Sequence, residues 1–471
     1  MNILSIYASH DGCVTYIKNN KIKFHTQIDR YNRFKYFAFP NKNLIQEIEK
    51  LKIDKIIISH THSNHCLKLW GHIIKYNSKK LKDIEIIYYG DKFHHLFHAY
   101  CALTWNKNIK NILVCDGRGA KFEDFFENES IYFYDKNLKH ILTEKNKICE
   151  RYEQFTIKHF GTGHDCGKTM AWSLYDKRPA TIQNNFENEL TEFIDNKNIS
   201  GDLHLTGGSA QNVINNSKLL LKFNNLFCDP FNGDFGLSLG AANFYLNNKI
   251  TNDKIYLGIP QELDTSIFYQ YNIVDTTTEE VSKILLNEPV AIFQSRSEQG
   301  QRGLGNRSLL MSPINKKAHN KLNQIKKREW FRPFACSVLK EKAKEWFDMP
   351  IDESPHMMYV FKIKKKNILK AGVSKNNDSR IQTVSKKNNL NFYNLLKTFY
   401  KLTGVPILVN TSLNLPGEVL VETMLDLKEL FDNSKLNYIY LPEIKKINEV
   451  ERIQITKRKF YRRLVYTFKC L

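Results

Sequence analysis

The residues best suited to chemistry are two histidines four positions apart, His94 and His98, in a segment with helical patterning. Because an α-helix turns once in about 3.6 residues, both imidazoles project from one face and can ligate the same metal ion. Two aspartates in glycine-flanked turns, Asp116 and Asp234, supply carboxylates. Two imidazoles with two carboxylates form a site suited to iron, manganese or zinc, with positions left open for a ligand. The sequence therefore predicts a metal centre at these four residues.

A second histidine cluster offers an alternative ligand set. His60, His62 and His65 stand close together between a predicted strand and the residues that follow it. No acidic residue accompanies them, so we interpret this cluster as a loop near the site.

The second half of the chain carries arginines and glycines in a pattern typical of an anion site. The segment 295–308 combines three arginines with three glycines, and the segment 326–334 adds cations around aromatic residues. The planar guanidinium binds phosphate through two hydrogen bonds, and glycines let the backbone approach the ligand. The alternative is a set of surface salt bridges, but neighbouring aromatic residues and prolines favour partial burial. The candidate ligands of a phosphate-bearing substrate are Arg302, Arg307, Lys326, Arg332, Arg380 and Asn410.

Two glycine-rich turns in the first half are further candidates for ligand contact. Gly207 and Gly208 stand between a predicted strand and helix, where backbone N–H groups and a helix N-terminus can face a phosphate or ribose. An ordinary turn is an equal alternative. The segment 161–169 resembles a P-loop, but its glycine spacing departs from the G-x-x-x-x-G-K-[ST] pattern, so we reject that interpretation. Lys168 within it remains a candidate for reaching an anionic ligand.

Length and composition set outer limits. A chain of 471 residues predicts two or three domains. The formal net charge of +21 suits a nucleic-acid partner, but much of it is lysine interleaved with asparagine, so we favour solvated lysine faces. Nine cysteines without a spaced framework, no long apolar run and no signal-peptide pattern at the N-terminus predict a cytoplasmic protein without a membrane span.

Strand and helix patterns alternate along the chain and predict a layered α/β fold. Expected strands cover 2–7, 13–18, 21–26, 55–59, 84–89, 111–115 and 203–206, and an expected helix covers 93–104. The first α/β domain extends to about residue 255, and a polar connection over about 247–278 follows it. A second α/β domain covers 275–444, and 445–471 forms a basic tail. No internal sequence repeat is evident.

Ten blocks in this order resemble the NodU-type O-carbamoyltransferase family, which includes nodulation, cephamycin and aminoglycoside carbamoyltransferases. The resemblance covers nearly the whole chain. The blocks are His10-Asp11, His94-His95-x-x-His98-Ala99, Asp116-Gly117, Gly167-Lys168-x-Met170, Leu205-x-Gly207-Gly208, Asp234-x-Gly236-x-x-x-Gly240-Ala241-Ala242, Glu298 to Ser308, Arg328 to Ala335, Arg380-x-Gln382-Thr383, and Gly404-Val405-Pro406 leading to Asn410-Thr411-Ser412-x-Asn414.

The resemblance implies an actin-like ATPase (ASKHA) fold for the first domain and a YrdC-like fold for the second. It implies that carbamoyl phosphate and ATP give carbamoyl-adenylate, whose carbamoyl group passes to a hydroxyl of a sugar-like or natural-product acceptor. It also implies Fe(II) or a similar divalent ion at His94, His98, Asp116 and Asp234, with Mg²⁺ as a further cation. His10 would be a base at the transfer site, and Lys326, Arg332 and Arg380 would act on carbamoyl phosphate or the adenylate. The implied nucleotide contacts are Lys168, Gly207, Gly208, Arg302, Arg307 and Asn410.

Three departures from the family pattern leave alternatives open. The family's Gly-Pro-Arg-Ala-Leu-Gly stands here as 300–305 with Gln301 in second place, Glu-Glu-Arg-Phe stands as 28–31, and Gly-Leu-Ala-Pro-Tyr stands as 171–175. The metal ligands and principal cations survive all three changes, so an active enzyme with an altered acceptor is the preferred hypothesis. A tRNA-modifying relative, which the net charge favours, and a catalytically silent binding protein are the alternatives. A homo-oligomer is compatible with all three.

Overall fold

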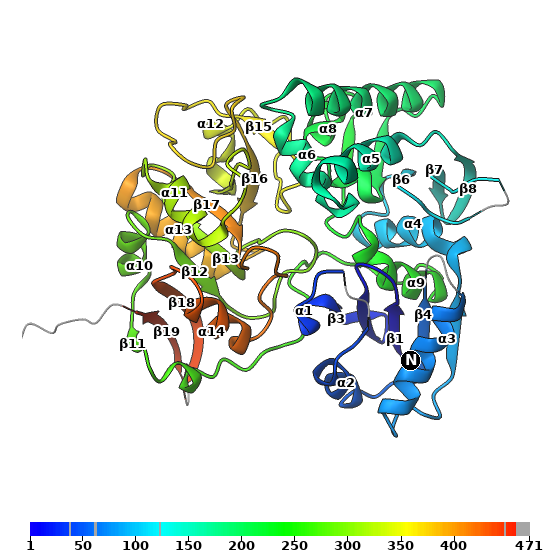
Figure 1. The fold of residues 1–471 in the computed structure, drawn as a ribbon, viewed down its shortest axis with the longest axis horizontal. Coiled ribbons are helices and arrows are strands. Elements are labelled where there is room, and N and C mark those ends of the chain that lie inside the picture. Colours follow the sequence, from blue (N-terminus) through cyan, green and yellow to red (C-terminus); the bar gives the residue numbers. More distant parts are fainter. Residues whose placement is uncertain (37–38, 61–63, 122–123, 447–448, 458–471) are drawn as a thin grey trace, which may run out of the picture.

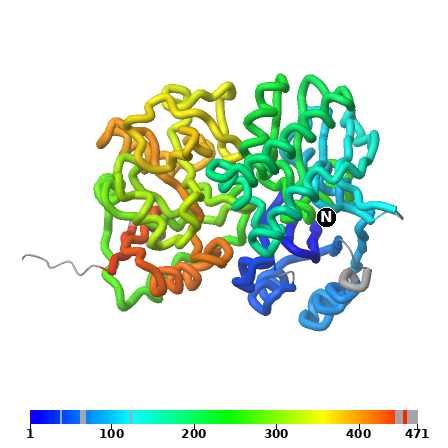
Figure 2. Tube along the Cα trace, turned by 45° about the horizontal axis from the view of Figure 1, so that its top comes forward, coloured from blue at the N-terminus to red at the C-terminus, as the bar shows by residue number. Residues whose placement is uncertain are grey.

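The computed structural model describes residues 1–36, 39–60, 64–121, 124–446 and 449–457. Within them the chain forms two halves that lie side by side, each with helices packed on mixed sheets (Figures 1 and 2). The mixed α/β class predicted from the sequence is confirmed. None of the helices in the described ranges combines the length and the hydropathy that a membrane crossing requires.

The first sheet is built from the N-terminal residues. Its strands are β1 (Asn2–Tyr7), β2 (Cys13–Lys18), β3 (Lys21–Gln27), β4 (Lys55–Ser59) and β5 (Ile86–Tyr89), in the order β3-β2-β1-β4-β5. The first three strands are antiparallel neighbours, and β4 and β5 run parallel to β1. Asn19 and Asn20 both have positive φ, the conformation of a tight hairpin turn that asparagine tolerates. The short helices α1 (Asp29–Asn32) and α2 (Lys42–Glu49) lie in the chain between β3 and β4, and the longer α3 (Asn64–Asn77) lies between β4 and β5.

The second sheet repeats the topology of the first. Its strands are β6 (Asn111–Cys115), β7 (Glu129–Asp135), β8 (Asn137–Glu144), β9 (Asp202–Thr206) and β10 (Asn225–Cys228), in the order β10-β9-β6-β7-β8. Three strands again form an antiparallel meander, and the last two run parallel to the first of them. The helices α5 (Ile148–Phe160), α6 (Cys166–Trp172), α7 (Lys177–Asn196) and α8 (Val213–Leu219) accompany this sheet.

Two helices lie between these sheets, and the first of them carries two of the four candidate metal ligands. α4 (His94–Trp105) packs on β6, α9 (Leu237–Tyr245) packs on β1 and β2, and the two helices pack against each other (Figure 1). A Cβ atom at Gly240 of α9 would lie 1.9 Å from the carbonyl oxygen of Phe97, so only glycine permits this approach. The sheets and this helix pair fix the spacing between the metal-site segments.

The second half is organised around one nine-stranded sheet, in the order β11-β19-β18-β12-β13-β17-β14-β16-β15. Its strands are β11 (Asn272–Asp275), β12 (Val290–Phe293), β13 (Arg307–Met311), β14 (Ala335–Leu339), β15 (Val360–Lys362), β16 (Asp378–Val384), β17 (Ile407–Ser412), β18 (Tyr438–Lys446) and β19 (Glu449–Thr456). Its helices are α10 (Thr278–Leu285), α11 (Ala318–Lys326), α12 (Ala343–Trp346), α13 (Leu390–Thr403) and α14 (Met424–Asp432). The sequence assigned 449–456 to a basic tail, but these residues pair with β18 and β11 because alternate residues such as Ile453 and Ile455 are apolar and buried.

Candidate functional site

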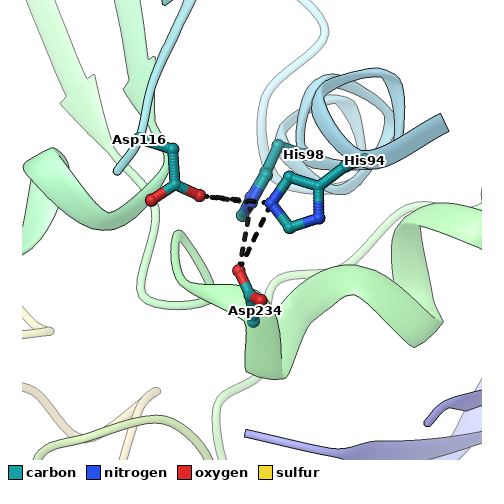
Figure 3. A group of neighbouring side chains, drawn as sticks. All are labelled: His94, His98, Asp116 and Asp234. Carbon is teal, nitrogen blue, oxygen red and sulfur yellow. Dashed lines mark hydrogen bonds and ion pairs between the residues drawn. The ribbon is translucent and has the colours of Figure 1, made fainter. Parts of the chain in front are cut away.

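The four predicted metal ligands come from three separate elements and meet between the two sheets of the first half. His94 and His98 project from one face of α4, Asp116 directly follows β6, and Asp234 opens a short 3-10 helix (Asp234–Gly236) before α9. One nitrogen or oxygen from each side chain lies within 4.8 Å of the others (Figure 3). The sequence prediction that these residues lie together is therefore confirmed by geometry.

The distances between these side chains suit a shared cation. The Nε2 atoms of His94 and His98 lie 3.3 and 3.2 Å from Oδ2 of Asp116. The same two nitrogens lie 3.6 and 3.5 Å from Oδ1 of Asp234. Three of the four residues are buried, and Asp116 is partly exposed. Two nitrogen and two oxygen donors converging on one point match the mixed ligand set of Fe, Mn or Zn.

At this centre the neighbouring groups favour a positively charged His98 beside ionised carboxylates. Burial alone would lower the pKa of His98, but hydrogen bonds to Asp116 and Asp234 raise it to about 9. Burial opposes ionisation of Asp116, but hydrogen bonds from His94 and His98 hold its pKa well below the usual range. Two carboxylates this close, one buried and one partly exposed, need a positive charge between them, which either a protonated imidazole or a metal ion supplies.

The second carboxylate oxygen of Asp234 holds two residues from the first sheet. Tyr7 donates its hydroxyl hydrogen to Oδ2 at 2.7 Å, and Nε2 of His10 lies 3.2 Å from the same oxygen. Burial would lower the pKa of His10, but the negative charges of Asp234 and Asp11 raise it. With a side chain 42% exposed, His10 borders the centre on its open side. Sequence reasoning missed Tyr7, although its place at the end of β1, three residues before His10, was a usable signal.

The glycine turn after β9 lies against the metal centre. The N–H of Gly208 donates to Oδ1 of Asp116 at 3.3 Å, and the N–H of Gly117 donates to the same oxygen at 2.8 Å. Gly207 has φ +87°, and a Cβ there would lie 2.4 Å from the carbonyl oxygen of Cys115. Gly208 therefore helps to orient Asp116, and Gly207 allows the turn to approach β6 closely. The role of both glycines as nucleotide contacts stays a prediction.

A second site consists of four arginines of the second half, which we call the arginine cluster: Arg302, Arg328, Arg332 and Arg380. Arg328 belongs to this set, although sequence reasoning did not single it out. Burial and its three arginine neighbours lower the pKa of Arg380 well below the usual range, and its Nε is buried without a hydrogen-bond partner. Burial and neighbouring guanidinium groups also lower the pKa of Arg302 to about 10 and that of Arg328 to about 9. Such crowding of like charges is costly unless an anion joins them.

Lys168 connects the first half to the arginine cluster. Its Nζ lies 3.0 Å from carboxylate oxygens of both Asp165 and Glu329. Glu329 in turn lies 3.5 Å from Arg332. On another side of the cluster, Arg302 donates to the carbonyl oxygen of Gln211, at the end of the glycine turn, at 3.4 Å. The cluster therefore faces both Lys168 and the segment that follows Gly208.

Three other predicted contacts lie in the interior of the second half. The Lys326 ammonium donates to the carbonyl oxygens of Ser412 and Asn414, and burial and the nearby arginines lower its pKa well below the usual range. The fully buried guanidinium of Arg307 donates to backbone carbonyls, including those of Gln294 and Glu422. Asn410 is buried and donates to Gly303, Ser337 and Gln382. Through these hydrogen bonds, Arg307 and Asn410 stabilise the segment that carries Arg302. Their contact with nucleotide stays a prediction.

The competing histidine cluster is only partly described. His62 and the side chain of His65 lie outside the described residues, and His60 directly follows β4. Among the described side chains, the group that could hold a metal ion is the one on α4, Asp116 and Asp234.

Comparison with known proteins identifies the second half. Residues 281–446 match the family model described as the carbamoyltransferase C-terminus. The second half therefore contains a region similar to the carbamoyltransferase C-terminal domain. All four residues of the arginine cluster lie inside this region.

Relatives extend the similarity beyond the carbamoyltransferase domain. Uncharacterized protein MJ1051 of Methanocaldococcus jannaschii is 27% identical over 89% of this chain and 94% of its own length. Nodulation protein NolNO of Sinorhizobium fredii is 34% identical over 50% of this chain, and 3'-hydroxymethylcephem-O-carbamoyltransferase of Amycolatopsis lactamdurans is 33% identical over 48%. The match spans less than half of these last two relatives, 38% and 45% of their lengths. The recognised resemblance to nodulation and cephem carbamoyltransferases is thus confirmed at the level of homology.

Proposed function

We propose that this protein is an ATP-dependent O-carbamoyltransferase. It would form carbamoyl-adenylate from carbamoyl phosphate and ATP, and transfer the carbamoyl group to a hydroxyl of a small, sugar-like acceptor. The observation that carries this proposal is the arginine cluster within the carbamoyltransferase C-terminal domain. Burial and neighbouring guanidinium groups lower the pKa of Arg302, Arg328 and Arg380. Glu329 lies within ion-pair distance of Arg332, the fourth member of the cluster. A phosphate-bearing substrate would relieve that repulsion.

The first chemical step belongs to the arginine cluster in this proposal. Water hydrolyses carbamoyl phosphate to carbamate and inorganic phosphate. A carbamate oxygen then attacks the α-phosphorus of ATP, and pyrophosphate leaves. Arg332 and Arg380 would hold the transferring phosphates, with Lys326 behind them. Arg302, Lys168 and the turn of Gly207 and Gly208 would contact nucleotide, with Arg307 and Asn410 fixing the Arg302 segment. Mg²⁺ would accompany the triphosphate.

The second step belongs to the metal centre in the first half. The acceptor hydroxyl attacks the carbamoyl carbon, AMP leaves with the bonding electron pair, and His10 takes the hydroxyl proton. The buried donor set of two imidazoles and two carboxylates fits Fe(II) or a similar divalent ion. When bound, such an ion supplies Lewis acidity toward an oxygen ligand. Tyr7 and His10 would fix the orientation of Asp234 through its second oxygen.

We further propose a fold for each of the two domains that carry these two reaction steps. The first domain, 1–255, would be actin-like, and the second, 275–444, would be YrdC-like. The repeated strand order of the two sheets in the first half supports a duplicated actin-like domain. The location would be cytoplasmic, with a homo-oligomer compatible with the fold.

A tRNA acceptor is the second candidate, and the formal net charge of +21 favours it. The decisive experiment incubates the purified chain with carbamoyl phosphate and ATP and measures pyrophosphate release, which should require both substrates. Absence of pyrophosphate would instead support a silent binding protein. Supplying small hydroxylated compounds or tRNA, with labelled carbamoyl phosphate, then separates the two acceptor classes.

A further inference from the structure

An aromatic cluster, which we call the aromatic seam, lies where the two halves meet beside the arginine cluster. It consists of Trp172, Tyr175, Trp330 and Phe331. The rings of Tyr175 and Trp330 meet edge to face with centroids 4.9 Å apart, and the rings of Trp172 and Phe331 are 6.4 Å apart. Tyr175 and Trp172 belong to the first half, at and just after α6, which Figure 1 shows on the side that faces the second half.

The seam leaves one large aromatic surface open. Trp330 is 68% exposed, whereas its neighbour Phe331 is 8% exposed. Its contacts with Tyr175 and Phe331, at interplanar angles of 72° and 84°, are edge to face. An exposed indole supported at its edges presents its flat face to a ligand. Because the planes of these neighbouring rings are steeply inclined to the indole and not parallel to it, the flat face of Trp330 offers a stacking surface, which we call the platform.

The seam stands between the two candidate reaction sites. Trp330 lies in sequence between Glu329 and Arg332, which form an ion pair, so the platform borders the arginine cluster. Trp172 lies one helical turn beyond Lys168, which contacts Glu329. Earlier on that segment, the ring of His164 lies 5.7 Å from the ring of His10. A molecule resting on the seam could therefore extend toward His10.

The cations at the seam favour a negatively charged ligand. The Lys375 ammonium lies 5.3 Å from the ring centroid of Tyr175, and the Arg178 guanidinium lies 5.4 Å from that of Trp172. Lys168 lies 5.5 Å from the ring centroid of the adjacent Phe160. Arg178 is paired with Asp176 and Lys168 with Asp165 and Glu329, while Lys375 is exposed. An acidic group on the ligand would complement Lys375 and the adjoining arginine cluster.

We propose that the aromatic seam binds the hydroxyl-bearing acceptor and that this acceptor is a saccharide carrying a phosphate or carboxylate group. The apolar face of a pyranose ring stacks on one aromatic face, which suits the open indole of Trp330. A base sandwiched between two rings would need parallel faces, and the steep angles at Trp330 do not supply them. This inference rests on the proposed transferase function and adds to it the class of acceptor and its location.

The test is ligand-observed saturation-transfer NMR on the full chain. The probes are UDP-N-acetylglucosamine for a phosphate-bearing sugar, trigalacturonic acid for a carboxylate-bearing sugar, and chitotriose as the neutral counterpart. At least one acidic probe should bind more tightly than chitotriose. Trp330→Leu, which keeps an apolar side chain but removes the flat ring, should weaken that binding about three- to tenfold. Tyr175→Leu should weaken it in the same direction from the other half.

Controls separate this inference from the function on which it rests. Tyr269→Leu removes an aromatic residue that is 83% exposed and outside the seam, and it should leave saccharide binding unchanged. The inference is overturned if no acidic saccharide binds, if Trp330→Leu binds it equally well, or if only ATP or tRNA binding depends on Trp330. Pyrophosphate release by the unmodified chain is measured in parallel. Its presence without Trp330-dependent saccharide binding refutes the acceptor assignment alone, and its absence refutes the transferase function.

Discussion

The guanidinium of Arg30 lies 3.5 Å from the carboxylate of Glu422, a residue 392 positions later, and both side chains are almost fully buried. Arg30 also donates to the carbonyl oxygens of Glu298 and Gly300. Arg30 belongs to α1 of the first half, and its three partners belong to the second. Arg30 therefore anchors the segment that leads into Arg302 and joins the two halves.

Replacing Arg30 should destabilise the protein more than any exposed ion pair does. Arg30→Ala leaves the buried Glu422 carboxylate without its counter-charge, a loss of about 3–5 kcal/mol in the free energy of unfolding. Chemical denaturation measures this value. Lys344→Ala, which breaks an exposed pair with Asp352, is the matched control and should cost less than about 1 kcal/mol. Equal effects from the two substitutions would show that the contact between the halves is not stabilising.

Removing one predicted metal ligand should empty the metal centre. His98→Ala deletes one of two imidazole donors and should strip the ion and abolish carbamoyl transfer while the fold persists. Metal content by mass spectrometry and circular dichroism measure the two quantities. His62→Ala, in the competing cluster, should retain the ion. Full occupancy in His98→Ala with loss in His62→Ala would move the centre to the other cluster.

Neutralising Arg332 should stop formation of the adenylate. The loss of one cation from a buried phosphate site costs roughly 2–5 kcal/mol, equivalent to about a 30- to several-thousand-fold lower rate. Pyrophosphate release from carbamoyl phosphate and ATP measures this step in Arg332→Ala. Preformed carbamoyl-adenylate should restore part of the transfer. Lys366→Ala, an exposed cation outside the cluster, is the control. A wild-type rate of adenylate formation in Arg332→Ala would refute the assigned role.

Replacing His10 should have the opposite effect. His10→Ala removes the base beside Asp234 and should spare pyrophosphate release while lowering transfer about 100-fold or more. His10→Gln keeps a polar group but no base, so it should not restore transfer. The ratio of carbamoylated acceptor to pyrophosphate reports the split between the two steps. Equal losses in both would place His10 in the fold or in the first step instead.

Glu129 should make stability depend on pH near neutrality. Burial raises the pKa of this carboxyl from 4.5 to about 7, although it accepts hydrogen bonds from the N–H groups of Asn146 and Ile148. Because the folded protein holds this proton more tightly than the unfolded chain, the stabilisation is fully present below about pH 4.5 and is lost by about pH 7. Its size is at most about 3 kcal/mol. Denaturation of Glu129→Gln across this range should lack that decline, and an unchanged pH profile would contradict it.

Local patterns predicted much of the first half. The strands β1, β2, β4 and β6 begin and end where apolar runs and turns placed them, because those runs are buried on one or both faces. The helical spacing of His94 and His98 and the two glycine-flanked aspartates were sufficient to predict the metal centre. Contacts between distant segments were not predictable, because no local pattern records which surfaces meet. The pairing of Arg30 with Glu422 and the ring contact of Tyr175 with Trp330 are of this kind.

The nine-stranded sheet shows why the end of the second half was misplaced. The segment 445–457 contains many charged residues, which suggested a tail. The stronger signal is the pair of apolar residues at alternate positions in β19, Ile453 and Ile455, because both are buried in the sheet. Arg328 was overlooked for a different reason. Its place in the cluster depends on its proximity to Arg302 and Arg380, which precede and follow it at a distance in the sequence.

The spread of the four metal ligands along the chain has a consequence for biosynthesis. His94 and Asp234 are 140 positions apart, and all five strands of the second sheet lie between them in the sequence. A nascent chain cannot assemble this ligand set until Asp234 has left the ribosome and the second sheet has formed. Loading of the proposed ion would therefore be a late event, and occupancy of the centre would report that the first half has been synthesised and folded.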